Sequence, residues 1–236
     1  MMIRIGNFLF RYRNGLFPAV YLLLFFQGRP LFADYRLAAL LGLLVASMGQ
    51  LVRAVTVGLE YIIRGGRNRQ VYAEQLVQGG VYAYCRNPMY IGNGLIVLGI
   101  GLASNSWLFM GVALPFFAFA YWAIVAAEEN YLRQKFGQQF EDYCQRVNRF
   151  LPNLPAGGQQ PGVARFNWRR VITAEYGSAY IWIAGLLLVT LKNAWLAHCV
   201  TTHRPLVQAL LVSLVGVTLG YVVARVLKKS GLLTTK

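Results

Sequence analysis

The sequence predicts an all-α, polytopic integral membrane protein with about six transmembrane helices and one cytoplasmic amphipathic helix. Of its 236 residues, 57% are hydrophobic and only 13% are charged, whereas soluble domains carry about one charged residue in four. Several uncharged runs approach or exceed the ~20 residues that a helix needs to cross a bilayer. Its 23 basic residues gather between these runs. This composition excludes soluble, collagen-like and disordered chains.

Two spans are predicted in the N-terminal part. The apolar stretch 14–28 follows three arginines, as the apolar part of a signal peptide would. A cleavage site there would have to use Leu31, which is too large, so we predict that the segment is retained as a span. The second span, 37–59, is interrupted only by Arg53, which we expect to snorkel to the interface.

A helical hairpin is predicted between Arg86 and Glu128, which enclose 41 residues without a charge. This run is about twice as long as one span requires. Small polar residues at 104–106 place the turn there and make 107–127 the second limb. Folding the run back on itself brings its two polar flanks together.

Two more spans are predicted near the C-terminus, at 176–191 and 206–224. The first is short, and we expect Glu175 and Lys192 at its ends to snorkel to the two interfaces.

Between the hairpin and these spans, residues 128–150 predict an amphipathic helix. Apolar side chains recur there every three or four residues, with charged and amide side chains between them. Such a helix lies on the membrane surface, either as an interfacial prop or as the lid of a site. The chain is thereby divided into N-terminal spans (1–75), a core of hairpin and amphipathic helix (76–152), and a linker with a two-span extension (153–236).

The basic residues also predict the orientation. With six spans, both termini and the second and fourth loops share one side, which collects 18 of the 23 lysines and arginines, against four on the other side. The positive-inside rule therefore places both termini in the cytoplasm, and a bacterial cytoplasmic membrane is the expected location. Because no soluble basic domain is present, no nucleic-acid partner is expected.

Polar clusters flank the hairpin on both sides. The segment 80–92 with Arg86 precedes it, and the adjacent Glu128 and Glu129 follow it. Ionisable groups at a membrane boundary tend to pair and to mark functional sites. A guanidinium forks well onto carboxylates, so we expect Arg86 to meet one of the two glutamates.

These motifs, in their order and spacing, resemble a known family: the integral-membrane methyltransferases that include isoprenylcysteine carboxyl methyltransferase and the phospholipid N-methyltransferases. The resemblance covers about residues 76–152 and rests on 76–82, 86–92, 99–101, 128–129 and 136–152. It implies methyl transfer from S-adenosylmethionine at the cytoplasmic face, with Arg86, Glu128 and Glu129 in catalysis. It also implies that the cofactor is bound by Asn87, Pro88, Tyr90, Gly92, Gly99, Gly101 and Glu128.

Several of these roles have alternatives. Tyr82 is either a ligand-stacking side chain of the cofactor site or part of an interfacial aromatic belt. The glycines of the first limb allow close approach either of an adenosyl group or of another helix. Glu129 either joins the site or is a solvated charge at a helix start.

The methyl acceptor is expected to be a lipid or a lipophilic small molecule. The only two histidines, His198 and His203, fall on the far side of the membrane, so no histidine base is available. This favours an acceptor that is already ionised, a carboxylate or thiolate, over an amine, which would need Glu128 or Glu129 to remove a proton. Family members that methylate carboxyl groups usually have histidine where Asn87 stands, and the two extra spans also leave the substrate open.

Two other functions remain possible at this point: an NADPH-dependent membrane reductase of the sterol-reductase type, and a non-enzymatic membrane scaffold. The extra C-terminal spans either wall the substrate entrance or form a homodimer contact. No metal site is predicted, because the cysteines form no Cys-x-x-Cys pair and the group His198, Cys199 and His203 matches no usual ligand spacing.

Overall fold

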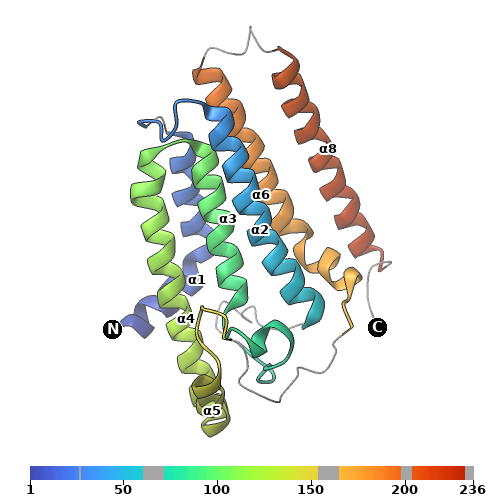
Figure 1. Ribbon diagram of the computed structural model, residues 1–236. Helices are drawn as coiled ribbons and strands as arrows, with labels where there is room; N and C mark the ends of the chain where they lie inside the picture. Colours follow the sequence, from blue (N-terminus) through green and yellow to red (C-terminus); the bar gives the residue numbers. More distant parts are fainter. Residues whose placement is uncertain (27, 61–71, 154–164, 198–203, 232–236) are drawn as a thin grey trace.

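In the computed structural model, long helices lie side by side in one bundle (Figure 1). The structure describes residues 1–26, 28–60, 72–153, 165–197 and 204–231, and all regular elements in these ranges are helical. The long helices are α1 (Met2–Tyr21), α2 (Tyr35–Leu59), α3 (Pro88–Ser104), α4 (Leu114–Phe136), α6 (Trp168–Leu196) and α8 (Arg204–Lys229), with the short α5 (Gln138–Arg146) at one end.

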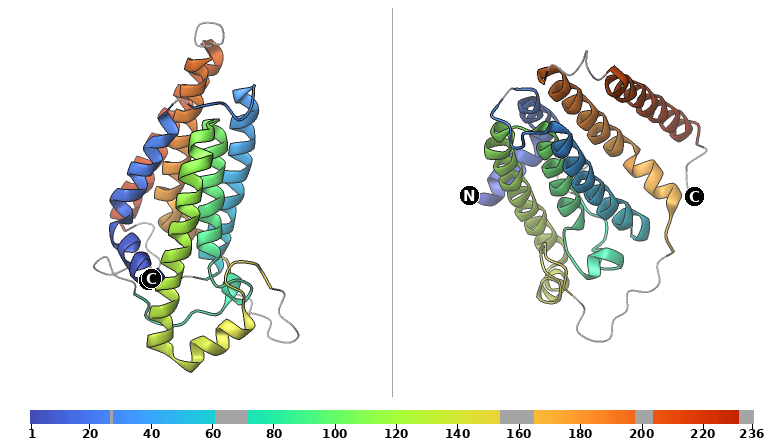
Figure 2. Two further views of the ribbon diagram at one scale, coloured as in Figure 1. Left: turned by 90° about the vertical axis from the view of Figure 1, so that its left-hand side faces the viewer. Right: turned by 45° about the horizontal axis from the view of Figure 1, so that its top comes forward.

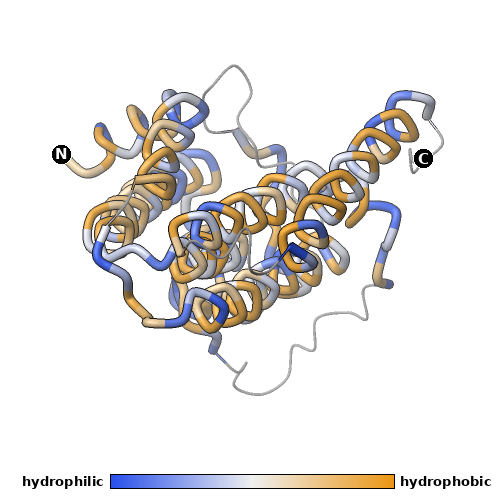
Figure 3. The backbone as a smooth tube through the Cα atoms, turned by 90° about the horizontal axis from the view of Figure 1, so that it is seen from above, coloured by the Kyte–Doolittle hydropathy of each residue, from blue (hydrophilic) through white to orange (hydrophobic). Residues whose placement is uncertain are grey.

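Membrane-spanning character is clear in most of these helices. Four segments are long and apolar enough to cross a membrane: α2, the continuous stretch Phe109–Phe136 that contains α4, α6 and α8. The shorter α3 is also apolar. In Figure 3, hydrophobic colour predominates along the helices. The prediction of an all-α polytopic membrane protein is therefore confirmed.

The helices associate in pairs. α3 packs along α2 and α4 packs along α1, while α6 lies against α2 and α3. α8 contacts α6 and stands at the edge of the bundle (Figure 2). The start of α1 and the end of α8 both lie toward the end that carries α5 (Figure 1).

Small residues let α2 and α3 approach closely. A Cβ atom added to Gly99 would lie 2.6 Å from the carbonyl oxygen of Gly42 and 2.5 Å from the backbone nitrogen of Ala46. A Cβ on Gly49 would lie 2.6 Å from the carbonyl oxygen of Gly92. Neither backbone leaves room for a methyl group, as at small-residue helix contacts in membranes.

The first helix begins earlier than predicted. α1 starts at Met2 rather than near residue 14, so Arg4, Arg11 and Arg13 lie inside it. Two of these arginines are exposed, and the guanidinium of Arg13 lies 4.1 Å from the centre of the Phe10 ring. Long basic side chains on an outer helix face keep their charge accessible while their stems pack, so they did not mark a helix boundary.

The predicted single amphipathic helix 128–150 is wrong. α4 continues through Glu128 and Glu129 to Phe136, and a separate α5 begins at Gln138. Gly137 joins them with φ 50° and ψ −125°, a conformation that glycine adopts at little cost. The two glutamates are therefore inside a membrane helix, not at a helix start.

The expected snorkelling of Arg53 and Glu175 is also wrong. α6 begins at Trp168, so Glu175 lies well inside it, and its carboxylate accepts two hydrogen bonds from the Arg53 guanidinium, at 2.7 and 2.9 Å. Gln50 also donates to Glu175, at 3.1 Å, and Arg53 also donates to Asn93 on α3. The two charged side chains are only 12% and 6% exposed, so they form a buried ion pair between α2 and α6.

Lys192, at the other end of the predicted span, was also expected to snorkel. Its Nζ instead donates to the carbonyl oxygens of Leu24 (2.8 Å) and Ser104 (3.1 Å). It thereby ties α6 to the end of α3 and to the turn that follows α1. The backbone carbonyls left free at helix ends explain why an ammonium group lies there.

We expect Glu175→Ala to destabilise the protein by about 3–5 kcal/mol, because it leaves the buried Arg53 guanidinium without its counter-charge. Unfolding in mixed detergent micelles measures this loss. Glu141→Ala is the matched control: it removes an exposed ion pair with Arg133 and is expected to cost less than about 1 kcal/mol. The double variant Arg53→Met/Glu175→Met should lose much less than Glu175→Ala. Equal losses for Glu175→Ala and Glu141→Ala would show that the buried pair does not hold α6 in place.

Candidate active site

The structure brings the two polar flanks of the hairpin together around Glu129. Its carboxylate forms an ion pair with Arg86, with 3.2 Å between Oε1 and Nη2, and accepts a second bond from Nη2 of Arg149. The side-chain amide of Asn87 donates to the same carboxylate at 3.4 Å. Glu129 is only 4% exposed. Two guanidinium groups and one amide therefore surround one buried carboxylate.

Local structure at the start of α3 positions Arg86 and Asn87. Pro88 occupies the first turn of the helix, where its missing N–H costs no hydrogen bond. Asn87 is the N-cap residue with φ −131°, so its side chain is directed back toward Glu129 and not along the helix. Arg86 lies just before it, and its backbone N–H donates to the carbonyl oxygen of Asn148 at 3.0 Å.

The chain returns to this point after α5. The N–H of Asn153 donates to the carbonyl of Tyr84 at 2.9 Å, and Asn87 Nδ2 donates to the carbonyl of Arg149 at 3.2 Å. The thiol of Cys85 donates to the carbonyl of Phe150 at 3.2 Å. These hydrogen bonds hold residues 147–153 beside residues 84–87. They thereby place the Arg149 side chain next to Glu129.

Arg86 has one donor that the described residues do not satisfy. Its Nη1 donates to the carbonyl oxygen of Cys144 at 3.2 Å, and its Nη2 faces Glu129. Its Nε is buried and has no hydrogen-bond partner in the part of the chain that the structure describes. A buried N–H without an acceptor is costly, so this atom marks a place for an acceptor from a ligand.

Glu128 faces a different partner from its neighbour. It is 9% exposed and accepts a hydrogen bond from the hydroxyl of Tyr90 on α3, at 2.7 Å. The Tyr90 ring contacts the Tyr121 ring of α4 edge to face, with 5.7 Å between centroids. One turn further along α3, a Cβ on Gly94 would meet no atom within 4 Å. Open space therefore adjoins the Tyr90–Glu128 pair.

Comparison with known proteins identifies the family of this chain. A family model described as phospholipid methyltransferase matches residues 37–139, which include most of α2, all of α3 and the whole continuous stretch Phe109–Phe136 that contains α4. The cobalt-zinc-cadmium resistance protein of Cupriavidus metallidurans is 32% identical over 161 residues, which are 64% of this chain and 68% of that protein. The chain belongs to the phospholipid methyltransferase family. The resemblance that the sequence motifs indicated is thus confirmed.

Two other known proteins are also similar to the chain. The nickel-cobalt-cadmium resistance protein of Alcaligenes xylosoxydans xylosoxydans is 28% identical over 159 residues, 64% of this chain and 69% of that protein. Protein-S-isoprenylcysteine O-methyltransferase of Schizosaccharomyces pombe is 31% identical over 134 residues, 53% of this chain and 52% of that protein. No solved structure matches the chain.

The three glycines that were expected at the cofactor do not lie in the polar cluster around Glu129. A Cβ on Gly92 would lie 2.6 Å from Cγ of Arg53, and one on Gly99 would strike the α2 backbone. A Cβ on Gly101 would lie 2.9 Å from the Phe109 ring. Gly101 is thirteen residues beyond Pro88, or about 20 Å along the helix axis. All three glycines lie at close contacts in the described residues, which fits the alternative interpretation, and their role at the cofactor stays a prediction.

Tyr82 also lies outside the cluster around Glu129. It is 4% exposed, and its carbonyl oxygen accepts a hydrogen bond from the Tyr143 hydroxyl at 2.7 Å. This bond ties the turn before α3 to α5. Among the described residues Tyr82 therefore occupies a buried packing position, and its stacking role at the cofactor stays a prediction.

Sequence reasoning missed Arg149 and Trp122. Arg149 was counted on the polar face of the predicted amphipathic helix, but α5 ends at Arg146, so Arg149 follows the helix and turns back to Glu129. Its guanidinium lies 5.2 Å from the centre of the Trp122 ring. The nearby Pro152 was a signal that the helix had already ended.

Metal ligands were not expected, and the group His198, Cys199 and His203 lies outside the described residues. Within the described ranges, no three His, Cys, Asp or Glu side chains lie together in a way that suits a metal ion. Cys85, next to the cluster, is 2% exposed, and burial raises the pKa of its thiol.

We expect Cys85 to be alkylated by a maleimide at pH 7.5 about tenfold more slowly than the less buried Cys144, because only an accessible thiolate reacts. Burial raises the pKa of both thiols, so both rates should rise with pH. Single-cysteine variants in detergent, followed by mass spectrometry, measure the rates, and denaturation in sodium dodecyl sulfate should equalise them. Equal rates in the folded protein would mean that residues 149–150 do not cover Cys85.

Proposed function

We propose that the cluster around Arg86, Glu128 and Glu129 binds S-adenosylmethionine and directs its methyl group to an amphiphilic acceptor from the membrane. The observation that carries this proposal is the buried Nε of Arg86, which has no hydrogen-bond partner among the described residues and lies beside a carboxylate that already holds two guanidinium groups. Membership of the phospholipid methyltransferase family supplies the reaction class.

The side chains present fit this cofactor. The Nε of Arg86 is placed to donate to its carboxylate, and Glu128 to accept from its ammonium group or ribose hydroxyls. Tyr90 and Tyr121 offer aromatic faces, which attract a cationic sulfonium centre. Pro88 and Asn87 shape the turn that holds Arg86. When bound, the cofactor supplies an electrophilic methyl group on a positively charged sulfur.

The residues of the chain contribute orientation and exclusion of water. Glu129 fixes the Arg86 guanidinium from one side, and the carbonyl of Cys144 fixes it from another. These two contacts therefore fix the orientation of the Arg86 Nε–H. The Tyr90 hydroxyl fixes the Glu128 carboxylate. Such alignment lowers the entropy cost of an in-line displacement, and burial removes competing water.

The acceptor we propose is a carboxylate or thiolate on a lipid or lipophilic molecule. An ionised acceptor needs no base, and the described residues around Glu129 include no histidine. An amine would instead require a carboxylate, Glu128, to take its proton. The name of the Schizosaccharomyces pombe relative, an isoprenylcysteine O-methyltransferase, supports an oxygen acceptor.

We place this end of the bundle at the cytoplasmic face of a bacterial inner membrane. The excess of lysines and arginines in the loops on that side supports the placement. The start of α1 and the end of α8 also lie toward the same end (Figure 1).

We expect the purified protein to bind S-adenosylhomocysteine, the reaction product, and Arg86→Ala to weaken this binding by about tenfold or more, because it removes a charge-assisted hydrogen bond. Isothermal titration calorimetry measures both affinities. Glu141→Gln is the control and should bind like the wild type, since it alters only an exposed ion pair. Binding of NADPH instead would favour a membrane reductase, and binding of neither ligand would favour a scaffold. Either result overturns the proposal.

We further expect methyl transfer from labelled S-adenosylmethionine into the carboxylate or thiolate fraction of a bacterial lipid extract. Glu128→Gln should lower the rate by about a hundredfold, if this side chain positions the cofactor as proposed. Mass spectrometry of the extract identifies the methylated product. A labelled amine as the main product would contradict the proposed acceptor class while leaving the cofactor assignment intact.

A further inference from the structure

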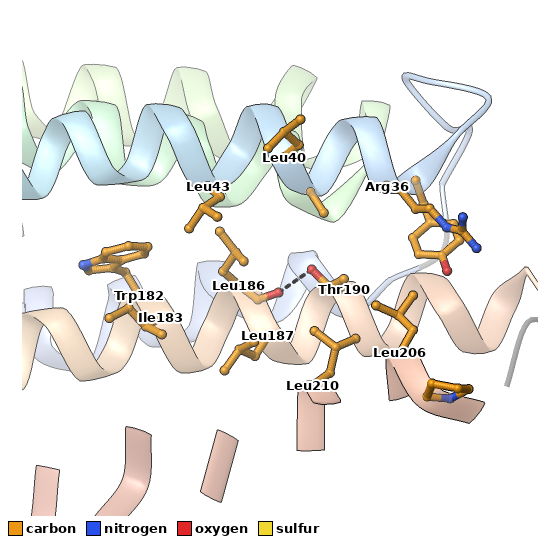
Figure 4. A pocket seen from close by; sticks show the side chains of 13 residues that line it. Arg36, Leu40, Leu43, Trp182, Ile183, Leu186, Leu187, Thr190, Leu206 and Leu210 are labelled. Carbon is orange, nitrogen blue, oxygen red and sulfur yellow. Dashed lines mark hydrogen bonds between the residues drawn. The ribbon is translucent and has the colours of Figure 1, made fainter. Parts of the chain in front are cut away.

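A cavity lies far from the candidate active site. It has a volume of about 620 Å³ and is bounded by α2, α6 and α8 in the half of the bundle opposite α5 (Figures 1 and 4). Its walls are mostly aliphatic, with Leu40 and Leu43 on α2, Ile183 and Leu187 on α6, and Leu206 and Leu210 on α8.

One end of this cavity is polar. Tyr35 lines it and is only 8% exposed, and its hydroxyl has no hydrogen-bond partner among the residues that the structure describes. The adjacent Arg36 also lines the cavity. The other hydroxyl in the wall, that of Thr190, already donates to the carbonyl oxygen of Leu186 at 2.7 Å (Figure 4). The buried Tyr35 hydroxyl and the Arg36 guanidinium at one end therefore favour an anionic hydrogen-bond acceptor.

Trp182 lies at the other end (Figure 4). Its indole N–H donates to the side-chain oxygen of Gln50 at 2.9 Å, so its polar atom is satisfied outside the cavity. From Trp182 to Thr190 the α6 wall extends about 12 Å along the helix axis. The cavity is thus an apolar groove with a polar group at one end and Trp182 at the other.

We propose that this groove binds one acyl chain of an anionic phospholipid, in the leaflet opposite the candidate active site. The phosphate accepts hydrogen bonds from the Tyr35 hydroxyl and the Arg36 guanidinium, and the chain lies along the leucines toward Trp182. The charge at the mouth argues for a phospholipid over the α8 helix of a second copy of the chain, because α8 carries no Asp or Glu that could accept from the Tyr35 hydroxyl and Arg36. α8 has no buried residue in its described range, so a lipid between it and α2 would add contacts for this helix.

The test is native mass spectrometry of delipidated protein in detergent, titrated with dioleoyl phosphatidylglycerol or with dioleoyl phosphatidylcholine. We expect one phosphatidylglycerol to be retained, and to bind at least about fivefold more tightly than phosphatidylcholine. Arg36→Gln and Tyr35→Phe should each weaken this binding severalfold. Ala39→Phe, which fills the groove, should abolish it. The control is Leu44→Phe, on the same helix at an exposed position that does not line the groove, and it should bind like the wild type.

Thermal unfolding gives a second readout. Added phosphatidylglycerol should raise the Tm of the wild type and of Leu44→Phe, raise that of Arg36→Gln less, and leave that of Ala39→Phe unchanged, because a ligand stabilises only the state that binds it. The proposal is overturned if Ala39→Phe retains the lipid, if Leu44→Phe loses it equally, or if the two lipids bind alike. A dimer that forms without lipid and is broken by Ala39→Phe would also overturn it, since the groove would then hold a second chain.

Discussion

The buried carboxylate of Glu129 is the interaction on which the functional end of the bundle depends. Arg86 comes from the turn before α3, Arg149 from the stretch after α5, and Glu129 from the middle of α4. Two guanidinium groups brought this close repel each other and are costly to bury. Only a carboxylate between them makes the arrangement favourable. One side chain therefore determines where three segments meet, and it leaves the buried Nε of Arg86 without a hydrogen-bond partner among the described residues.

A second buried ion pair ties the C-terminal extension to the same helix. Asn93 on α3 accepts from Arg53, whose guanidinium is held by Glu175 of α6, and Gly92 provides the room that the Arg53 stem needs. Asn93 is only six residues, less than two turns, from Asn87, which contacts Glu129. α3 is thus fixed at its start by one ion pair and slightly further along by another. A shift of α6 would act on the candidate site through α3.

Much of this arrangement could be predicted from the sequence, and the failures have physical causes. The long uncharged run required a hairpin, and the hairpin required Arg86 to lie near the glutamates, so that pairing follows from length alone. The ends of α1, α4 and α6 were misplaced because charges were taken as helix boundaries. A charged side chain can remain inside a membrane helix when it is paired, like Glu175, or when it lies on an outer face, like Arg4.

Arg149 shows a different limit of sequence reasoning. Its partner is twenty positions earlier in the chain, and the contact depends on the corner at Gly137 and on the end of α5. A helical pattern drawn through 128–150 assigns every residue a face, but it cannot show that the chain leaves the helix after Arg146. Similarly, the sequence around Gly99 is the same whether this glycine faces a ligand or α2. Only the packing of α3 against α2 decides between these two roles.

The apolar groove and the candidate active site are separated by a polar barrier. Arg36 at the mouth of the groove and Arg53 beside α3 are seventeen residues apart on α2, about 25 Å along the axis. Trp182 lies at the end of the groove nearer Arg53 and donates a hydrogen bond to Gln50, which in turn donates to Glu175. A phospholipid held at Arg36 therefore cannot bring its head group to Glu128, and it is a structural ligand of the extension and not the methyl acceptor. The acceptor has to reach the Arg86–Glu129 end by another route, from the leaflet on that side.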